Sequence, residues 1–590
     1  MKRMLPLLLL ATAASAATYY WNGNVPTGSY TDPASWLVNG ATPSTLDPLA
    51  IDSAAIFNQT ATVTFPAAST LSFYQWVISD AGRTVILSIP SGTTVSCASS
   101  SFRNPFSCGS GVKAILAGGG TLDNGNKENY IDGGAELCLT GPGTTFQNAN
   151  FWFRNAGSRF RIEDGAVASG GKFQNVATAS TNVLDAATVT GVGDFKFMGA
   201  DASLDVRNGA TLSMASGGFS LESGGLLRIR GEGTTANVAN TYMGGANPGE
   251  IRVEDGASYT SFSSTKVGAG SGAGQTLRFR GAGTTARIIG NGNNTASILV
   301  GGGDSPADNT VIVEDGAYML ITTNNPGYHP RGVVFGEENF GTQNKICARS
   351  RFIVRSGATV ASEFPLWLCF AHDSEVVVSN ATLTAGGSSR VCFNSASTSS
   401  NRIAAVDGGV LEIAGDIYLA TGSGACGAEL LCRDATVNVD YAIKAENTPA
   451  SGIPSRIRIE GTNGVITAGS LYTGSATGSM VLSFGIPAGG RSDDGAYLVL
   501  VDPDYGIKNA TAVLELDIDR AFARKVKGSA TVDLISVPRR DNSRTRLETF
   551  AATATEADLR GCSLSIVDTG SAYVLRLASG GPDPTLLILL

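Results

Sequence analysis

The sequence contains few charged residues and almost no histidine. Charged residues make up 16% of its 590 residues, whereas an average globular protein has about 25%. The 2 histidines, His329 and His372, belong to no HExxH motif and to no other paired-ligand spacing, so zinc-dependent catalysis is not expected. Apolar residues still account for 43%, which argues against a charged disordered tail and against a coiled coil. The composition indicates a folded protein with few exposed helix surfaces.

Long apolar runs and long basic runs are also missing from the body of the chain. Beyond the N-terminus, no stretch reaches the length of about 18 consecutive apolar residues that a membrane-spanning helix requires. We therefore expect no membrane-spanning segment in the mature chain. The net charge is -8, and basic residues gather only between Arg520 and Arg540. Nucleic acids and anionic membranes are therefore not expected as partners.

The N-terminus has the pattern of a secretory signal peptide. Two basic residues precede an apolar stretch from Met4 to Ala14, and the small-residue site Ala14-Ser15-Ala16 follows. This pattern predicts a signal peptide over residues 1–16. We expect an exported protein that is extracellular or at the cell surface, with the periplasm as an alternative.

Glycine is abundant, with 74 residues of 590, well above the usual share of about 7%. Many of these glycines mark sequence corners that recur along the chain. Ten of the twelve steps between successive corners lie between 21 and 27 residues. The two longer steps fall around residues 291–308 and 329–344, which we interpret as insertions. The corner residues are Gly141, Gly165, Ala186, Gly209, Gly231, Gly256, Gly281, Gly316, Gly357, Ala381, Gly408, Ala435 and Gly461.

Short strings in which apolar and charged residues alternate precede these corners. Examples are Leu226–Arg230, Leu277–Arg280 and Arg456–Ile459. A period of two predicts strands with one buried face, and no convincing helical window occurs between Thr62 and Gly478. The sequence therefore predicts an all-β fold, a right-handed parallel β-solenoid (β-helix), with the handedness taken from the general rule for parallel crossovers.

Segments without the repeat flank the solenoid on both sides. We expect an N-terminal aromatic cap over residues 17–60, a solenoid with coils of about 22–27 residues over 61–478, and a small β-rich C-terminal cap or terminal module over 479–590. Caps are expected because the end coils of a solenoid expose unpaired strand edges. In the C-terminal segment we expect strands at 481–484, 497–501, 512–518, 531–537, 563–567 and 573–577, and short helical turns at 544–552 and 556–560.

The N-terminal motifs and the corner strings resemble a known group of proteins. The opening contains Trp21-Asn22-Gly23, then Trp36, then the string from Asp52 to Phe57, and the corners include VEDGA, VRNGAT and VRSGAT. These motifs resemble secreted bacterial proteins that carry autotransporter-associated β-strand repeats, over most of the chain from Tyr19 to Gly464. The resemblance implies an extracellular or cell-surface, adhesin-like β-helix, and it assigns no catalytic residue. We expect Trp21, Trp36, Asp52 and Phe57 to be structural.

The 9 cysteines have an odd count, so they cannot all pair within one chain. The candidate disulfides are Cys97 with Cys108 and Cys426 with Cys432. Three further cysteines follow the coil period, and an interior stack is the favoured interpretation, with disulfides as the alternative. No CxxC spacing accompanies them, which argues against a metal site. These three are Cys347, Cys369 and Cys392.

A catalytic site would require residues that depart from the repeat. The acidic corners at Glu163, Glu254 and Glu314 recur as repeat elements, so we interpret them as turn formers. The two insertions hold the best singular residues, and no cofactor or metal is expected. If the protein is an enzyme, the first residues to test are Asp304, Asp308, His329, Arg331, Glu337 and Glu338.

These observations favour a structural or adhesin-like β-solenoid whose long surface binds glycans or other cell-envelope components. One alternative is a carbohydrate-active β-helix enzyme, either a polysaccharide lyase or a glycoside hydrolase. A second alternative is a passive component of a surface layer or matrix.

Overall fold

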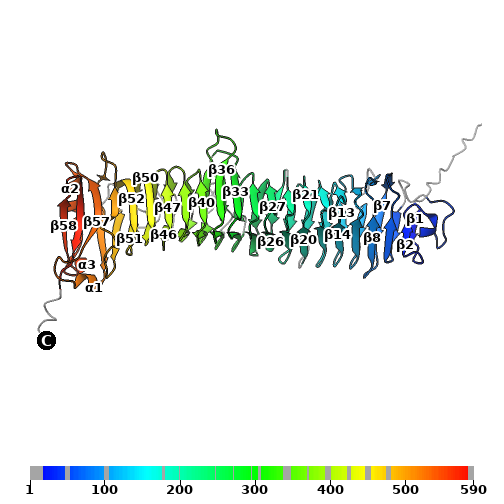
Figure 1. The fold of residues 1–590 in the computed structure, drawn as a ribbon, viewed down its shortest axis with the longest axis horizontal. Coiled ribbons are helices and arrows are strands. Elements are labelled where there is room, and N and C mark those ends of the chain that lie inside the picture. Colours follow the sequence, from blue (N-terminus) through cyan, green and yellow to red (C-terminus); the bar gives the residue numbers. More distant parts are fainter. Residues whose placement is uncertain are drawn as a thin grey trace, which may run out of the picture. The chain divides into compact units, whose positions relative to one another are not determined.

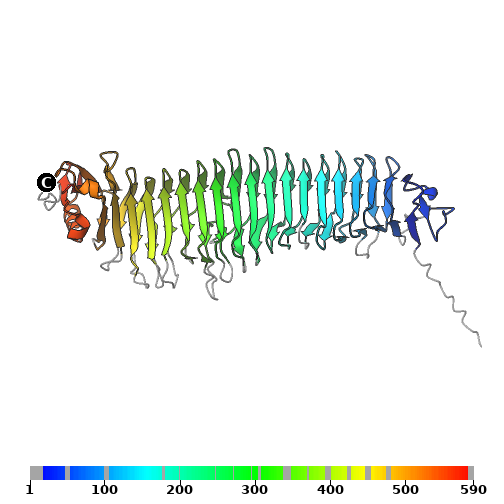
Figure 2. The ribbon, with the colours of Figure 1, turned by 90° about the horizontal axis from the view of Figure 1, so that it is seen from below.

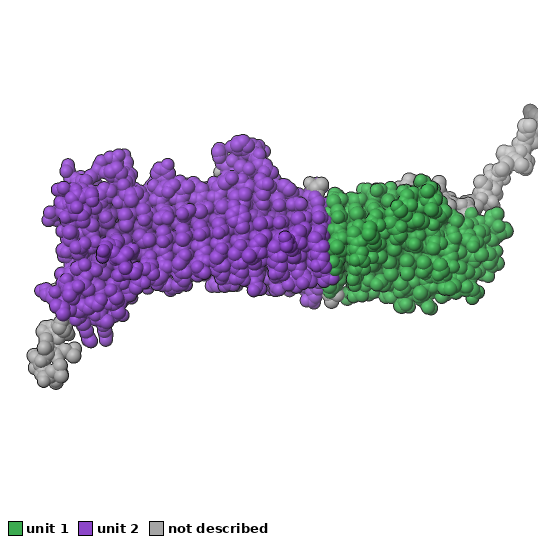
Figure 3. Space-filling model, in the orientation of Figure 1, with its two compact units in different colours: residues 1–193 green, residues 194–590 purple. Residues whose placement is uncertain are grey.

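The structure is a computed structural model. It describes residues 17–46, 54–98, 105–175, 180–197, 199–214, 216–245, 247–269, 272–293, 295–302, 307–336, 347–368, 371–391, 400–420, 427–445, 453–473, 480–509 and 511–581. The fold is an all-β parallel β-solenoid with 55% strand and 4% helix (Figure 1). The chain forms two compact units, residues 1–193 (unit 1) and residues 194–590 (unit 2) (Figure 3).

The strands of unit 1 form three parallel ladders, which we call faces 1, 2 and 3, and the first coil has no strand on face 2. Face 1 consists of β2 (Thr27–Ser29), β5 (Ala61–Thr64), β8 (Thr84–Ser88), β11 (Lys113–Ala117), β14 (Glu136–Thr140), β17 (Arg159–Glu163) and β20 (Thr181–Asp185). Face 2 consists of β6 (Thr70–Phe73), β9 (Thr94–Cys97), β12 (Thr121–Asp123), β15 (Thr145–Gln147), β18 (Val167–Ser169) and β21 (Thr188–Thr190). Face 3 consists of β1 (Thr18–Trp21), β4 (Ala54–Phe57), β7 (Gln75–Ile78), β10 (Phe106–Cys108), β13 (Asn129–Ile131), β16 (Asn150–Phe153) and β19 (Lys172–Asn175).

Unit 2 repeats the same three faces, and Figure 2 shows its strands side by side. Face 1 consists of β23 (Ser203–Arg207), β26 (Gly225–Arg230), β29 (Gly249–Glu254), β32 (Thr276–Arg280), β35 (Thr310–Glu314), β39 (Arg351–Arg355), β43 (Glu375–Ser379), β46 (Ser400–Val406), β49 (Gly427–Arg433), β51 (Ser455–Glu460), β53 (Met480–Ile486) and β56 (Val513–Ile518). Face 2 consists of β24 (Thr211–Ser213), β27 (Thr235–Val238), β30 (Ser258–Ser261), β33 (Thr285–Gly290), β36 (Tyr318–Thr323), β40 (Thr359–Ser362), β44 (Thr382–Ala385), β47 (Val410–Ile413), β50 (Thr436–Ala445), β52 (Val465–Tyr472), β54 (Ala496–Leu500) and β57 (Thr531–Pro538).

Face 3 of unit 2 consists of β22 (Phe195–Phe197), β25 (Gly218–Leu221), β28 (Asn240–Gly244), β31 (Thr265–Ala269), β34 (Ala296–Val300), β37 (Arg331–Phe335), β41 (Leu366–Trp367), β45 (Ser389–Arg390), β48 (Ile417–Ala420) and β55 (Ile507–Lys508). The long strands β50 and β52 bend from face 2 into face 3, because each pairs with strands of both faces. A short pair, β38 (Cys347–Ala348) with β42 (Ala371–His372), lies between faces 3 and 1. The segment 291–308, which we predicted to be an insertion, contains β34 and therefore supplies part of a regular coil.

Alternation in the sequence decides which side chains are buried. In β26, Leu227 and Ile229 have no exposed surface, while Arg228 and Arg230 point outward, as the period of two predicts. The acidic corners are turns, as predicted. Asp255 and Gly256, for example, have φ angles of 58° and 85°, a region that favours glycine and tolerates Asp.

Side-chain amides and hydroxyls satisfy buried backbone groups where face 3 turns into face 1 of unit 2. Asn309 Oδ1 accepts a hydrogen bond from the Gln275 N–H at 3.0 Å, and Asn401 Oδ1 accepts one from the Ser374 N–H at 3.1 Å. Because an unpaired buried amide is costly, these polar residues stabilise the corner that they line.

Three of the four N-terminal residues that we expected to be structural lie in the core. Trp21, Trp36 and Phe57 are at most 1% exposed, and the Trp21 and Trp36 rings lie 5.1 Å apart edge to face. Trp36 follows the 3-10 helix η1 (Pro33–Ser35) and forms β3 (Trp36–Leu37), which pairs antiparallel with β1. Because β1 also pairs parallel with β4, the cap already belongs to the ladder of face 3. Asp52 lies outside the described residues.

The C-terminal segment has the predicted strands and helical turns, but it continues the solenoid further than we expected. Strands β53 to β57 extend the parallel ladders beyond residue 479. Only then does the pattern change, since β59 (Ala572–Ala578) pairs antiparallel with both β57 and β58 (Ser563–Asp568). Three helices accompany these strands, α1 (Arg520–Ala523), α2 (Ser543–Ala551) and α3 (Glu556–Leu559). In the part of the chain that the structure describes, no helix is long and apolar enough to cross a membrane.

Candidate functional site

The predicted catalytic residues do not form one cluster where the structure describes them. Asp308 lies where face 3 turns into face 1, and its two carboxylate oxygens each accept a hydrogen bond of 2.8 Å from the Arg349 guanidinium. These bonds lower the pKa of Asp308, so this carboxyl is suited to an ion pair and not to a general acid. His329 and Arg331 lie at another corner, before and at the start of β37 on face 3. Asp304, Glu337 and Glu338 lie outside the described residues.

The cysteines have structural surroundings. Cys108 is a buried free thiol, so the predicted disulfide between Cys97 and Cys108, both of them described residues, is not formed. Burial raises the pKa of Cys108 well above its ordinary value, which makes the thiol unreactive.

The stack of Cys347 on Cys369 stays a prediction, because Cys369 lies outside the described residues. Cys347 is fully buried, as predicted, and burial raises the pKa of its thiol to about 12. In the next coil, however, its partner in register is Ala371, because the two coils are offset by more residues than the cysteine spacing. Cys369, Cys392 and Cys426 lie outside the described residues, but Cys432 is a free thiol, so the predicted disulfide between Cys426 and Cys432 is not formed. Cys432 is buried, and its Sγ lies 3.1 Å from the Ala435 carbonyl oxygen.

Face 1 is charged, but its charges are paired along the ladder. In unit 2, Glu314 is only 4% exposed and accepts hydrogen bonds from Arg278 in the preceding coil, at 2.5 Å, and from Arg355 in the following coil, at 2.6 Å. Such pairs hold neighbouring coils together, which leaves these side chains little capacity to bind a ligand.

Outward side chains on face 3 of unit 2 alternate between aromatic and cationic residues. The guanidinium of Arg390 lies 4.7 Å from the Trp367 ring, and Lys444 Nζ lies 4.9 Å from the Tyr418 ring. The guanidinium of Arg331, one of the predicted catalytic residues, lies 3.9 Å from the same Trp367 ring. Because cations cover these ring faces, the contacts stabilise the stack of coils. In register order the stack is Trp367, Arg390, Tyr418, Lys444, Tyr472 and Lys508.

The surface is hollowed at the corner where face 2 turns into face 3, over the coils of β50, β52 and β54–β55. A hollow of about 650 Å³ lies there, and we call it the tyrosine groove. Tyr441 and Tyr505 line it and are 65% and 61% exposed. Such exposure is high for tyrosine, a residue of intermediate burial in most proteins. The other lining residues used below are Asp416, Asp440, Lys444, Gly469, Ser470, Val501, Asp502 and Lys508.

Local backbone features place the two tyrosines at this corner. The register of β50 against β52 shifts between Val439 and Ala442, and this irregularity turns Asp440 and Tyr441 outward. Tyr505 follows a turn in which the Asp502 carboxylate accepts hydrogen bonds from the N–H groups of residues 504 and 505 at 2.7 and 3.3 Å, as Asp typically does in turns. The bulge in β50 and the Asp502 turn therefore fix the backbone positions of the two tyrosines.

The coil between them has a glycine at the corner. A Cβ atom at Gly469 would lie 2.5 Å from the carbonyl oxygen of Tyr441 and 2.9 Å from that of Asp440. Only glycine allows the backbone of β52 to pack this closely against the bulge in β50. The corner between the tyrosines consequently carries no side chain at position 469, while Tyr472 of the same strand lines the groove three residues further along.

The charges in the groove differ in how they are held. Asp416 accepts hydrogen bonds from Lys444 Nζ at 2.8 Å and from the Ala442 N–H at 3.0 Å. Partial burial lowers the pKa of Lys444, but the hydrogen bonds from its ammonium group to Asp416 and Tyr418 outweigh this effect, so the pKa of Lys444 is raised. Asp440 is exposed and has no hydrogen-bond or ion-pair partner among the described residues, so its carboxylate can accept bonds from a ligand.

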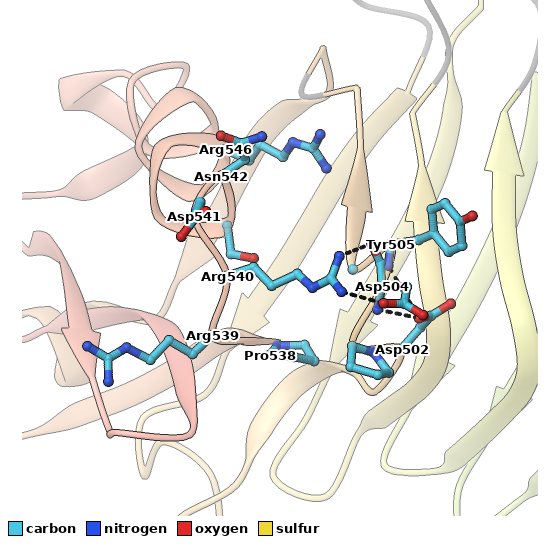
Figure 4. A pocket seen from close by; sticks show the side chains of 12 residues that line it. Asp502, Asp504, Tyr505, Pro538, Arg539, Arg540, Asp541, Asn542 and Arg546 are labelled. Carbon is cyan, nitrogen blue, oxygen red and sulfur yellow. Dashed lines mark hydrogen bonds and ion pairs between the residues drawn. The ribbon is translucent and has the colours of Figure 1, made fainter.

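Two further hollows adjoin the groove. One of about 660 Å³ shares Asp440 and Val501 with it and extends over face 2, where Glu412 and Asn438 line it. The other, of about 500 Å³, shares Asp502 and Tyr505 and is shown in Figure 4.

The hollow of Figure 4 lies between the last coils and the segment that leads into α2. Arg540 forms an ion pair with Asp504, and its Nη1 donates to the Asp504 carbonyl oxygen at 2.6 Å. The Tyr505 side chain points away from Arg540 in Figure 4. Asp504 is thus occupied by Arg540, while Tyr505 belongs to the groove.

The described residues contain no group of three or more His, Cys, Asp or Glu side chains that could hold a metal ion. The groove itself is lined by aromatic rings, carboxylates and two lysines.

Sequence reasoning missed this groove, although a signal for it exists. The string Asp440-Tyr441-Ala442-Ile443-Lys444 recurs as Asp504-Tyr505-Gly506-Ile507-Lys508. The two copies are two coils apart, so a search for one-coil repeats passes over them.

No family model matches the chain, and no curated protein matches it.

Proposed function

We propose that the protein is an exported, adhesin-like β-solenoid that binds glycans in the tyrosine groove. The observation that carries this proposal is the pair of exposed rings, Tyr441 and Tyr505, beside carboxylates in a hollow of about 650 Å³. Ligand sites combine apolar and aromatic surface with a few convergent polar groups. A sugar ring matches both features, because its C–H faces pack on aromatic rings and its hydroxyl groups donate to carboxylates.

Export and a place at the cell surface are supported by the N-terminal sequence pattern and by the resemblance to autotransporter-associated repeats. The repeated coil also supports an adhesive role, since a solenoid presents its side chains in an extended, regular array.

A glycan array tests the proposal. The mature chain is expected to bind at least one glycan class, and the double variant Tyr441→Ala/Tyr505→Ala is expected to lose that binding. The matched control is Tyr318→Ala, which removes a tyrosine that is 40% exposed on face 2 and is not part of the groove. The proposal fails if no glycan binds, which would favour a passive surface-layer component, or if the double variant binds as the wild type does.

A carbohydrate-active enzyme is the second candidate, and one observation favours it. Asp416, Asp440 and Asp502 lie in the same groove, and glycoside hydrolysis requires paired carboxylates. A degradation assay separates this candidate from binding alone. Release of reducing or unsaturated ends by the wild type but not by Asp440→Asn would establish the enzyme, and absence of release with a bound glycan would exclude it.

A further inference from the structure

Building on the proposed glycan binding, we propose that the groove binds a linear, neutral, β-1,4-linked glycan along the direction in which the coils stack, and that two coils match one disaccharide. The bound chain would consist of hexose or N-acetylhexosamine units.

The groove has a period of two coils. Ile443 pairs with Leu471, which in turn pairs with Ile507. The two Asp-Tyr corners, each three residues before a lysine of this register, are therefore equivalent positions separated by one intervening coil. That coil has Gly469 and Ser470 at the corner, and its ring in the groove, Tyr472, lies in register with Lys444 and Lys508 and not with Tyr441 and Tyr505.

The period fits the geometry of an extended sugar chain. Neighbouring coils are about 4.8 Å apart, so the two corners are about 9.6 Å apart. One pyranose unit of an extended chain advances by roughly one coil spacing, and in a β-1,4 linkage each sugar is turned by about half a turn relative to the previous one. The same face of the chain thus recurs on every second sugar, which is the spacing of Tyr441 and Tyr505.

The small residues of the intervening coil leave space for the sugar between the two stacked ones. A side chain at Gly469 is excluded by the carbonyl oxygens of Asp440 and Tyr441, so the corner position between the two tyrosines stays free of side-chain atoms. Three sugars then lie over three successive coils, the outer two against the tyrosines.

The charges favour a neutral glycan. Asp416 neutralises Lys444 through their bond of 2.8 Å, which leaves the carboxylates of Asp440 and Asp502 with Lys508 as the groove's remaining charges. Carboxylates accept hydrogen bonds from sugar hydroxyls and repel uronate or sulfate groups.

Calorimetric titration of the mature full-length chain tests this match. The probes are β-1,4-linked oligosaccharides of glucose and of N-acetylglucosamine with two to six sugars, and β-1,3-linked glucose oligosaccharides of equal length, whose backbone curves. We expect the affinity for one β-1,4 series to rise at least tenfold between two and four sugars, where the chain begins to reach both tyrosines. The β-1,3 series is expected to bind at least tenfold more weakly at four sugars.

Single variants test whether the rise in affinity between two and four sugars, which we call the length step, arises in the tyrosine groove. Tyr441→Ala and Tyr505→Ala should each abolish the step while short oligosaccharides still bind, and Tyr318→Ala should preserve it. Circular dichroism verifies that each variant is folded. The two-coil match is wrong if both linkages bind equally or if the step survives in the single variants, even though glycan binding itself would then stand. If no oligosaccharide or array glycan binds, the proposed function fails as well.

Discussion

Aromatic residues have opposite placements in the first coils of unit 1 and in the last coils of unit 2. In unit 1, Trp21, Trp36 and Trp76 are at most 1% exposed and pack on one another and on phenylalanines. In unit 2, Tyr441 and Tyr505 are more than half exposed. Packing in the core explains the positions of the three tryptophans. No described residue covers most of the surface of the two tyrosines.

This difference in burial distinguishes rings that we expect to stabilise the fold from rings that we expect to bind a ligand. A buried aromatic ring contributes several kcal/mol to stability, and its position follows from the inward side of a strand. An exposed ring contributes little to folding, and our proposal of a ligand starts from the bulge and the turn that place two such rings on the surface. The predictions below test that distinction.

The largest expected effect is on stability in unit 1. Trp36→Ala removes a fully buried ring whose indole N–H donates to the Tyr30 carbonyl oxygen at 3.0 Å, and we expect a loss of about 3–5 kcal/mol in the free energy of unfolding. Tyr505→Ala should change this free energy by less than about 0.5 kcal/mol. Denaturant unfolding followed by circular dichroism measures both. Equal destabilisation by the two substitutions would contradict the distinction between buried and exposed rings.

The next effect concerns the corner between the tyrosines. Gly469→Val would place side-chain atoms against the backbone of the Asp440–Tyr441 bulge, so we expect a loss of about 1–3 kcal/mol in stability together with weaker glycan binding. The control is Gly489→Ala, because a Cβ atom there meets nothing within 4 Å. Unfolding and glycan titrations are measured on both variants. Unchanged stability and affinity in Gly469→Val would show that the corner does not depend on glycine.

A smaller effect distinguishes the ring of Tyr441 from its hydroxyl group. Tyr441→Ala should weaken glycan binding about tenfold, or ~1.4 kcal/mol, whereas Tyr441→Phe should retain affinity within about threefold because it keeps the ring face. Titration with the best array glycan compares the two. If Tyr441→Phe loses as much as Tyr441→Ala, hydrogen bonding and not stacking carries the contact.

The smallest effect concerns pH and unit 1. Burial of Glu136 disfavours its charge, but hydrogen bonds from Lys113 and Arg159 outweigh this and keep the pKa of Glu136 below its ordinary value of 4.5. The stability that this carboxylate contributes is fully present above pH 4.5 and is lost as the pH falls through the lower pKa of the folded state. Glu136→Gln should therefore lose less stability than the wild type between neutral and acid pH. The midpoint temperature of thermal unfolding is measured for both proteins as the pH is lowered. An equal fall of this temperature in the two proteins would refute the stabilising role of the Glu136 carboxylate.

The solenoid could be predicted from the sequence because its signal is repeated in every coil. Alternation such as that of Leu227 with Arg228 gives the strands, and corners such as Asp255-Gly256 give the period. The C-terminal limit was predicted too early because the next Asp-Gly corner, Asp494-Gly495, lies further from Gly461 than one regular step, although the strands β53 to β57 still join the ladders.

The candidate site could not be predicted in the same way, because it depends on register and not on spacing alone. Cys347 and Cys369 match the coil period in sequence, yet Cys347 pairs with Ala371. Asp308 departs from the repeat but is held by Arg349. Tyr441 and Tyr505 are far apart in sequence, and only the pairing of β50, β52 and β55 places them on one groove.

Hydroxyl-radical footprinting tests the central claim, that the exposed tyrosines form a glycan site, most directly. The mature chain is oxidised with and without a saturating concentration of its best array glycan, and the oxidation of individual tyrosines is read by mass spectrometry. We predict strong protection of Tyr441 and Tyr505 and no protection of Tyr318. A bound glycan that leaves both groove tyrosines as reactive as before would contradict the claim.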